Sequence, residues 1–134
     1  DWQRGSRMEA EGLKELEAAQ KANVTSSADV VNAQNKTDSS QERSVNASAE
    51  FNRLTATTPA FSAGKDALDW AKRVNRAAEN WARFDQRGNT GAKDLDKAMR
   101  EQRKAQQAIE KAQAKVDRGR GMKTDAERMS VTGG

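Results

Sequence analysis

The segment DWAKRVNRAAENWARF, residues 69–84, carries the strongest secondary-structure signal in the chain. Its apolar residues are four, three, four and three positions apart, which places them on one narrow face of an α-helix. They are Trp70, Val74, Ala77, Trp81 and Phe84. The opposite face is polar and mostly basic. The segment therefore predicts an amphipathic helix that must bury this face against another helix.

A second amphipathic helix, predicted over residues 92–118, offers a partner for this face. Its large apolar residues are Leu95, Met99, Ile109 and Val116, with alanines on the same side. Between the two helices lies Gly88-Asn89-Thr90-Gly91, a sequence typical of turns. Helices joined by about four residues usually pack antiparallel. We therefore expect an antiparallel helical hairpin over residues 59–118, in which the nine apolar residues of the two helices form one packing seam.

The C-terminal residues 119–134 lack an apolar face and contain several glycines. This composition predicts a flexible basic tail.

The N-terminal part, residues 1–58, is expected to form a long polar, Ala-rich helical segment. In residues 23–48, Asn, Ser, Thr and Gln account for 14 of 26 positions, which lowers the helix propensity. However, Val24, Val31 and Val45 are seven and fourteen residues apart, and no Gly or Pro occurs from Leu13 to Thr58. We favour a helix with a small-residue packing face, and a disordered tether is the alternative. Thr58-Pro59 marks the boundary, because proline suits the first position of the next helix.

The composition indicates an all-α protein with little independent core. Only 34% of the residues are hydrophobic and 33% are charged, and there is a single proline and no tyrosine. Strand patterns are nearly absent. Long helices with so thin a core are expected to gain stability from oligomeric packing, as in coiled coils.

The residue types argue against an enzyme. The chain contains no histidine and no cysteine, which removes the commonest general base, the usual triads and thiolate metal sites. Two pairs of carboxylates, Asp66 with Asp69 and Asp94 with Asp96, lack the contrasting surroundings that separate an acid from a base. We therefore predict no catalytic, cofactor-binding or metal-binding residues.

The basic excess lies near the C-terminus, where residues 92–134 contain 11 basic and 7 acidic residues. Cations in this region are candidates for contacts with nucleic-acid phosphates or an anionic surface. The candidates are Arg100, Arg103, Lys104, Lys111, Lys115, Arg118 and Arg120. Because Glu101, Glu110 and Asp117 interrupt them, a solvated helix face is the favoured interpretation. Trp70 and Trp81 beside basic residues also fit a membrane-interface helix, although their narrow face favours helix packing.

The middle of the chain resembles a known family of viral proteins. The motifs Asn-Ala-Gln-Asn-Lys at 32–36, Val-Asn-Ala at 45–47 and Phe-Asn-Arg-Leu at 51–54 lie in an Ala/Asn/Gln-rich helix. In this respect the chain is similar to the small internal virion, or ejection, proteins of short-tailed bacteriophages. The resemblance implies a helical capsid protein that is released at infection and oligomerises into a DNA-conducting assembly. The chain lacks the long apolar stretch with which such a protein would enter a membrane.

Two functions therefore remain open. The first is a non-enzymatic structural protein of the phage virion, with copies of itself and other virion proteins as partners and only weak, non-specific DNA contact. The alternative is a basic helical binding protein for nucleic acid or an anionic membrane surface, with a cytoplasmic location. Whether the chain contacts a membrane stays open.

Overall fold

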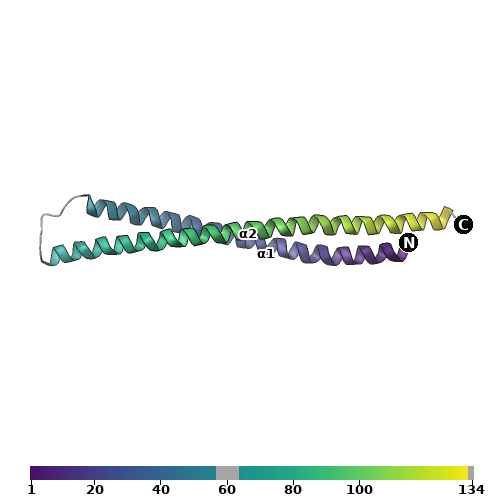
Figure 1. Cartoon of the computed structure of the whole chain (residues 1–134), viewed down its shortest axis with the longest axis horizontal. Helices are drawn as coiled ribbons and strands as arrows, with labels where there is room; N and C mark the ends of the chain where they lie inside the picture. The colour runs from purple at the N-terminus through teal and green to yellow at the C-terminus, as the bar shows by residue number, and fades with distance from the viewer. Residues whose placement is uncertain (57–63, 133–134) are drawn as a thin grey trace. The chain divides into compact units, whose positions relative to one another are not determined.

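The computed structural model describes residues 1–56 and 64–132, and in these residues it contains two long helices and no strand. Helix α1 spans Trp2–Thr55 and α2 spans Lys65–Thr132 (Figure 1). Helices of 54 and 68 residues are far longer than the globular average of about 12 and are typical of coiled coils. The expected all-α fold is confirmed.

Local chemistry explains where the two helices begin and end. The carboxylate of Asp1 accepts a hydrogen bond from the backbone N–H of Gln3 at 3.1 Å and so caps α1. Helix α1 ends at Thr55, shortly before Pro59, as the sequence predicts. Gly64 precedes α2 with φ of 96°, a conformation that side-chain-bearing residues rarely adopt. The predicted helix start at Pro59 lies outside the described residues.

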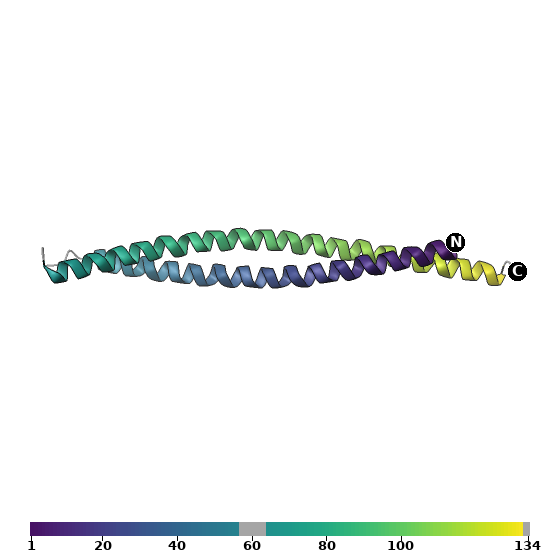
Figure 2. The same ribbon diagram turned by 90° about the horizontal axis from the view of Figure 1, so that it is seen from below.

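The chain divides into two compact units, and each unit pairs a part of α1 with a part of α2. Unit 1 consists of Asp1–Asp29 and Lys97–Gly134, and unit 2 consists of Val30–Asp96. In unit 1, the purple start of α1 lies beside the yellow end of α2 (Figures 1 and 2). Within each unit, residues that come later in α1 contact residues that come earlier in α2. The helices are therefore antiparallel within each unit.

Small residues recur every seven positions along α1 and form its most buried row. This small-residue row of α1 is Gly5, Gly12, Ala19, Ser26, Ala33, Ser40, Ala47 and Leu54, all buried except the half-buried Ala47. A second, mostly half-buried row lies four residues after each member of the first. It comprises Glu9, Leu16, Asn23, Val30, Thr37, Ser44 and Phe51. Spacings of four and three define a heptad seam, and small residues in it let two helix backbones approach closely.

Helix α2 carries the matching pattern. Its small-residue row, in which Phe84 is the one large member, is Ala77, Phe84, Gly91, Ala98, Ala105, Ala112, Gly119 and Ala126, and all but Phe84 and Ala126 are buried. The companion row is Val74, Trp81, Gly88, Leu95, Gln102, Ile109, Val116 and Lys123. Val116 is the largest fully buried side chain among the described residues, with 0% exposure. Each unit thus packs a thin core of mainly Gly, Ala and Ser.

Two buried hydroxyls in the polar stretch of α1, those of Ser26 and Thr37, are hydrogen-bonded within the helix. Ser26 Oγ donates to the carbonyl of Ala22 at 2.7 Å, and Thr37 Oγ1 donates to the carbonyl of Ala33 at 2.8 Å. Such bonds to the preceding turn remove the cost of burying an unpaired hydroxyl. Low intrinsic propensity is therefore compatible with the observed helix over residues 23–48, as predicted.

Helix α2 continues through residues 88–91, so the predicted turn and the hairpin over residues 59–118 are wrong. Gly88 and Gly91 lie in the seam of unit 2, and both are buried. A Cβ on Gly91 would lie 2.5 Å from Thr37 Oγ1. These glycines provide space for α1 rather than a reversal of the chain. The partner of residues 70–84 is therefore α1, as shown by the contact of Trp81 with Phe51 at 5.8 Å between ring centroids.

The predicted flexible tail is also helical as far as Thr132. Gly119 is buried in unit 1, where a Cβ would lie 2.5 Å from the backbone nitrogen of Glu9. The small-residue row thus extends beyond residue 118. Large apolar residues become sparse beyond residue 118, so the pattern of apolar residues did not predict that the packing face continues there.

The seven-spaced valines of α1 are not part of the packing face. Val24, Val31 and Val45 are 69%, 56% and 67% exposed. The seam instead contains the residues immediately before them, such as the half-buried Val30. The expected period was correct, but its register was wrong by one residue.

Candidate interaction surfaces

Arginine residues from both helices line a groove in unit 2. The groove has a volume of about 570 Å³. Four guanidinium groups line it together with two asparagines, and Phe84 and Glu50 complete much of its wall. The arginines are Arg43 and Arg53 of α1 and Arg73 and Arg76 of α2.

The electrostatics of this groove favour anions. Glu50 is engaged by Arg53, with an N–O distance of 2.7 Å. Arg43 and Arg87 instead lie over the ring of Phe84, with distances of 5.4 and 5.5 Å to its centroid. Such cation–π contacts hold guanidinium groups in place without neutralising them. The groove therefore keeps a positive excess that suits carboxylate or phosphate groups.

The flank of unit 1 is different because its cations are paired with α1. Lys115 Nζ lies 2.9 Å from Glu15 and 3.3 Å from Glu11. The hydrogen bond to Glu15, then that to Glu11, raises the pKa of Lys115 above its ordinary 10.5. Glu9 lies 3.8 Å from Arg120. Two of the predicted anion contacts, Lys115 and Arg120, therefore serve to hold the two helices together.

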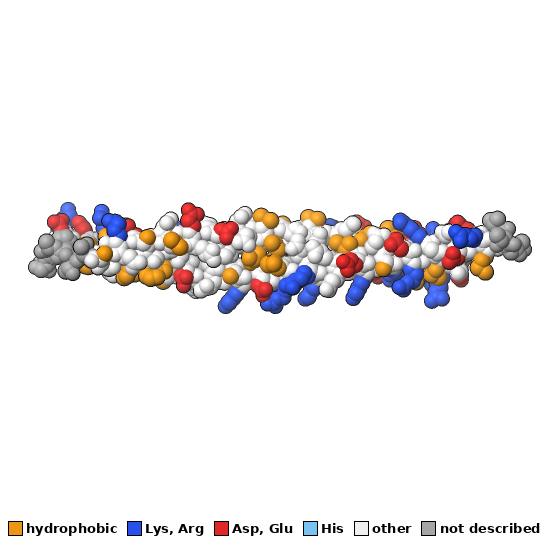
Figure 3. Space-filling model, turned by 90° about the horizontal axis from the view of Figure 1, so that it is seen from above, with side chains coloured by type: hydrophobic (Ala, Val, Ile, Leu, Met, Phe, Trp, Pro, Cys, Tyr) orange, Lys and Arg blue, Asp and Glu red, His pale blue; other side chains and the backbone are white. Residues whose placement is uncertain are grey.

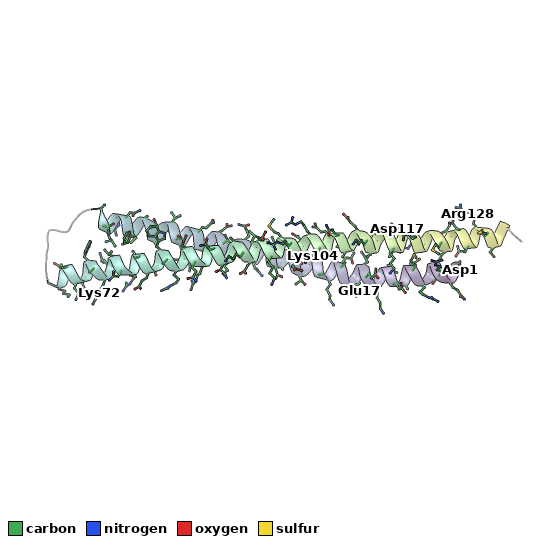
Figure 4. All side chains as sticks on the ribbon, in the orientation of Figure 1. Asp1, Glu17, Lys72, Lys104, Asp117 and Arg128 are labelled. Atoms are coloured by element: carbon green, nitrogen blue, oxygen red, sulfur yellow. The ribbon has the colours of Figure 1, made fainter. Side chains whose placement is uncertain are left out.

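The other predicted anion contacts lie on the solvent side of α2 in unit 1. Arg103, Lys104, Lys111 and Arg118 are exposed, as is Arg100, which also contacts a neighbouring residue. Lys104 is labelled on α2 in Figure 4. Basic side chains gather along one edge of the face shown in Figure 3.

The predicted seam residues are buried to different extents. Ala77 and Val116 are buried. Five further members are half-buried, namely Trp70, Val74, Phe84, Leu95 and Ile109. Trp81 is 38% exposed, and Met99 lies off the seam with 46% exposure. Trp70 also donates from Nε1 to the carbonyl of Leu54 at 3.0 Å. Its indole is thus used for packing within unit 2.

The outward positions of α1 are uncharged at the end of its part in unit 1 and at the start of its part in unit 2. In unit 1 they are Val24, Thr25 and Ala28, and in unit 2 they are Val31, Asn32 and Asn35, while the exposed Asp29 directly precedes the seam residue Val30. Helix α2 instead presents a mixture of basic, acidic and neutral residues at its outward positions, for example Lys97, Asp96 and Gln107. The two helices therefore offer surfaces of different chemistry.

Acidic residues do not form a reactive or metal-binding cluster in the described segments. Asp66 and Asp69 share a hollow with Lys72, Arg73 and Arg76, consistent with charges in the first turns of α2. No group of three or more potential metal ligands is found in residues 1–56 and 64–132. Within the same residues, neither helix has a stretch apolar enough to cross a membrane.

Sequence reasoning missed the arginine groove and the small-residue rows. The rows were visible as Gly, Ala and Ser at intervals of seven in both halves of the chain. The groove had no comparable signal, because Arg43 and Arg76 are brought together only by the register of α1 against α2.

The chain matches no protein-family model, no curated protein and no solved structure.

Proposed function

We propose that the chain is a non-enzymatic structural protein that assembles side by side with copies of itself, most concretely as an internal virion or ejection protein of a bacteriophage. The observation that carries this proposal is the uncharged outer face of α1. Val24 and Val31 are more than half exposed on it. Exposed apolar side chains rimmed by small polar ones are typical of protein interaction sites.

A second copy of the same chain fits this face better than a charged partner. The chain carries a net charge of +4, so contact through most of its surface would be opposed by repulsion between copies. The outer face of α1 avoids this cost because Thr25, Ala28, Asn32 and Asn35 are neutral. Its small side chains also permit close approach of another helix. The resemblance of residues 32–54 to ejection proteins supports the same role.

Molar mass in solution tests the proposal. We expect multi-angle light scattering to give a multiple of the chain mass of 14.7 kDa. The double variant Val24→Lys, Val31→Lys should be monomeric, because it places charges in the contact. A matched control, Ala82→Lys, Gln107→Lys, adds the same charge to exposed positions of α2 and should keep the assembly.

Circular dichroism must show that both variants remain helical. A monomeric parent chain would contradict self-assembly. Equal dissociation of the two variants would also overturn the proposal, because added charge rather than the face of α1 would then be responsible.

A further inference from the structure

Four cations recur at intervals of seven residues along the solvent side of α2 in unit 1. Lys97, Lys104, Lys111 and Arg118 are all exposed. Seven residues correspond to nearly two helical turns, so the four side chains project from one face at steps of about 10.5 Å. We call this set the basic row.

The basic row differs from the cations of α2 that flank the seam in unit 1, which are paired with α1. Lys115, Arg120 and Lys123 form ion pairs with glutamates of α1. Within the described residues, no ion pair is found for any member of the basic row. Cations that bind the two helices together are thus separate from cations that face solvent.

Nearby acids do not interrupt the row as strongly as the sequence order suggests. Glu110 and Asp117 directly precede Lys111 and Arg118, which places each acid about 100° around the helix from its neighbour. From Lys104 to Arg118, Gln107 and Ala114 separate successive cations on the face itself, and both are neutral. The acids nearest to the face are Asp94, one turn before Lys97, and Glu101, one turn before Lys104.

We propose that the basic row binds the phosphate backbone of double-stranded nucleic acid without reading its sequence. One strand of duplex DNA carries a phosphate every 3.4 Å or so along the axis, so each step of the row spans about three phosphates. Because phosphates are this closely spaced, the row requires no particular register along the duplex for its cations to lie near the backbone. Lys and Arg side chains that contact only phosphates position a protein but carry no sequence information.

An anionic membrane is a poorer partner for the same row. A helix that lies in a membrane interface needs an apolar face beside its cations. In unit 1, the apolar residues Ile109 and Val116 of α2 are directed to the seam, and Val116 is completely buried. From Lys104 to Arg118 the row alternates cations with Gln107 and Ala114. Nucleic-acid binding goes beyond the assembly role proposed above and requires no oligomer.

Titration of a labelled DNA duplex at several salt concentrations tests this binding. Four phosphate contacts give a log–log salt slope of about −3.6, or about 150-fold weaker binding when salt rises from about 50 to about 200 mM. The variant Lys97→Gln, Lys104→Gln, Lys111→Gln, Arg118→Gln should lose most of this binding and its salt slope. Duplexes of different sequence should bind the parent chain equally.

A matched control removes four exposed cations of α2 in unit 2 that do not follow one another at intervals of seven. Lys65→Gln, Arg73→Gln, Arg83→Gln, Lys93→Gln removes the same charge and should retain most of the affinity. Equal losses in the two variants would overturn the proposal, since net charge alone would then explain binding. Absence of duplex binding by the parent chain, or binding only to phosphatidylserine vesicles, would overturn it as well. Circular dichroism of each variant checks that the helices are intact.

Discussion

The two units use different side chains for the same packing pattern. In unit 1, the small-residue rows contribute glycine or alanine at nearly every step, and Val116 is the only large side chain that is fully buried among the described residues. In unit 2, aromatic residues enter the seam, with Phe51 against Trp81 and the indole of Trp70 bonded to the backbone of Leu54. Unit 1 is thus stabilised by close backbone approach, and unit 2 by larger side chains near its end.

Glycine contacts are close in the seam of unit 1 and mixed in unit 2, where Gly91 is close to Thr37 and Gly88 is not close to any atom. A Cβ on Gly119 in unit 1 would lie 2.7 Å from the carbonyl oxygen of Gly5. On Gly88 in unit 2, a Cβ would approach nothing closer than 3.8 Å, the distance to Ser40 Cβ. The same residue type in the same kind of seam therefore meets different constraints. A heptad pattern alone does not say how tightly two helices pack.

The largest effect is expected for Gly119→Ala. The added methyl group would collide with the backbone of α1, which cannot move as a side chain can, so we expect a loss of about 3 kcal/mol in the free energy of unfolding. Gly121→Ala is the control, because its Cβ would meet nothing within 4 Å. It should stabilise the helix by about 0.5–1 kcal/mol. Gly88→Ala should also be tolerated. Urea denaturation with a constant m-value measures all three, and equal stability of the Gly119 and Gly121 variants would contradict the close approach.

Trp81→Ala is expected to have the next largest effect. A buried aromatic residue contributes about 3–5 kcal/mol, but Trp81 is 38% exposed, so we expect a loss of about 2 kcal/mol. Part of this loss comes from its contact with the ring of Phe51. Met99→Ala removes a side chain that lies off the seam and should change stability by less than about 0.5 kcal/mol. Equal effects of the two substitutions would show that the aromatic seam of unit 2 contributes little.

The sequence predicted the helical class and the face of residues 70–84, because large apolar side chains at intervals of four and three are a strong signal. It failed at Gly88 and Gly91, where glycine was interpreted as a helix breaker. The structure buries both in the seam, and at Gly91 α1 leaves no space for a side chain. Glycine costs up to about 1 kcal/mol in a helix interior. Close packing with α1 offsets this cost. The gain is not visible in the sequence of α2 alone, because it depends on the partner helix.

The interaction surfaces were harder to predict for a related reason. The seven-residue steps from Lys97 to Arg118 are visible in the sequence. The expected turn at residues 88–91 and the neighbouring acids nevertheless favoured the interpretation as an ordinary solvated helix face. Whether a cation is available depends on its partner across the seam. Lys115 and Lys111 are only four residues apart, yet Lys115 is paired with Glu11 and Glu15 and Lys111 is not. That distinction requires the register of α1 against α2.

The smallest expected effect concerns the ion pairs of Lys115, which distinguish the flank of unit 1 from the arginine groove of unit 2. The pKa of Lys115 is raised in the folded chain by Glu15 and then by Glu11. A raised folded-state pKa means that the ion pairs stabilise the fold fully below about pH 10.5, the unfolded value, and that this contribution disappears as pH rises through the folded-state pKa.

Lys115→Gln should therefore be less stable than the parent chain at pH 7 to 9, and the difference should vanish at strongly alkaline pH. High salt should also reduce it, because these side chains are partly exposed. Lys111→Gln is the control and should match the parent chain across the same range, since Lys111 has no ionic partner among the described residues. A stability difference for Lys115→Gln that persists unchanged at alkaline pH would assign its role to packing of the aliphatic stem rather than to charge. The flank of unit 1 would then no longer differ electrostatically from the groove of unit 2.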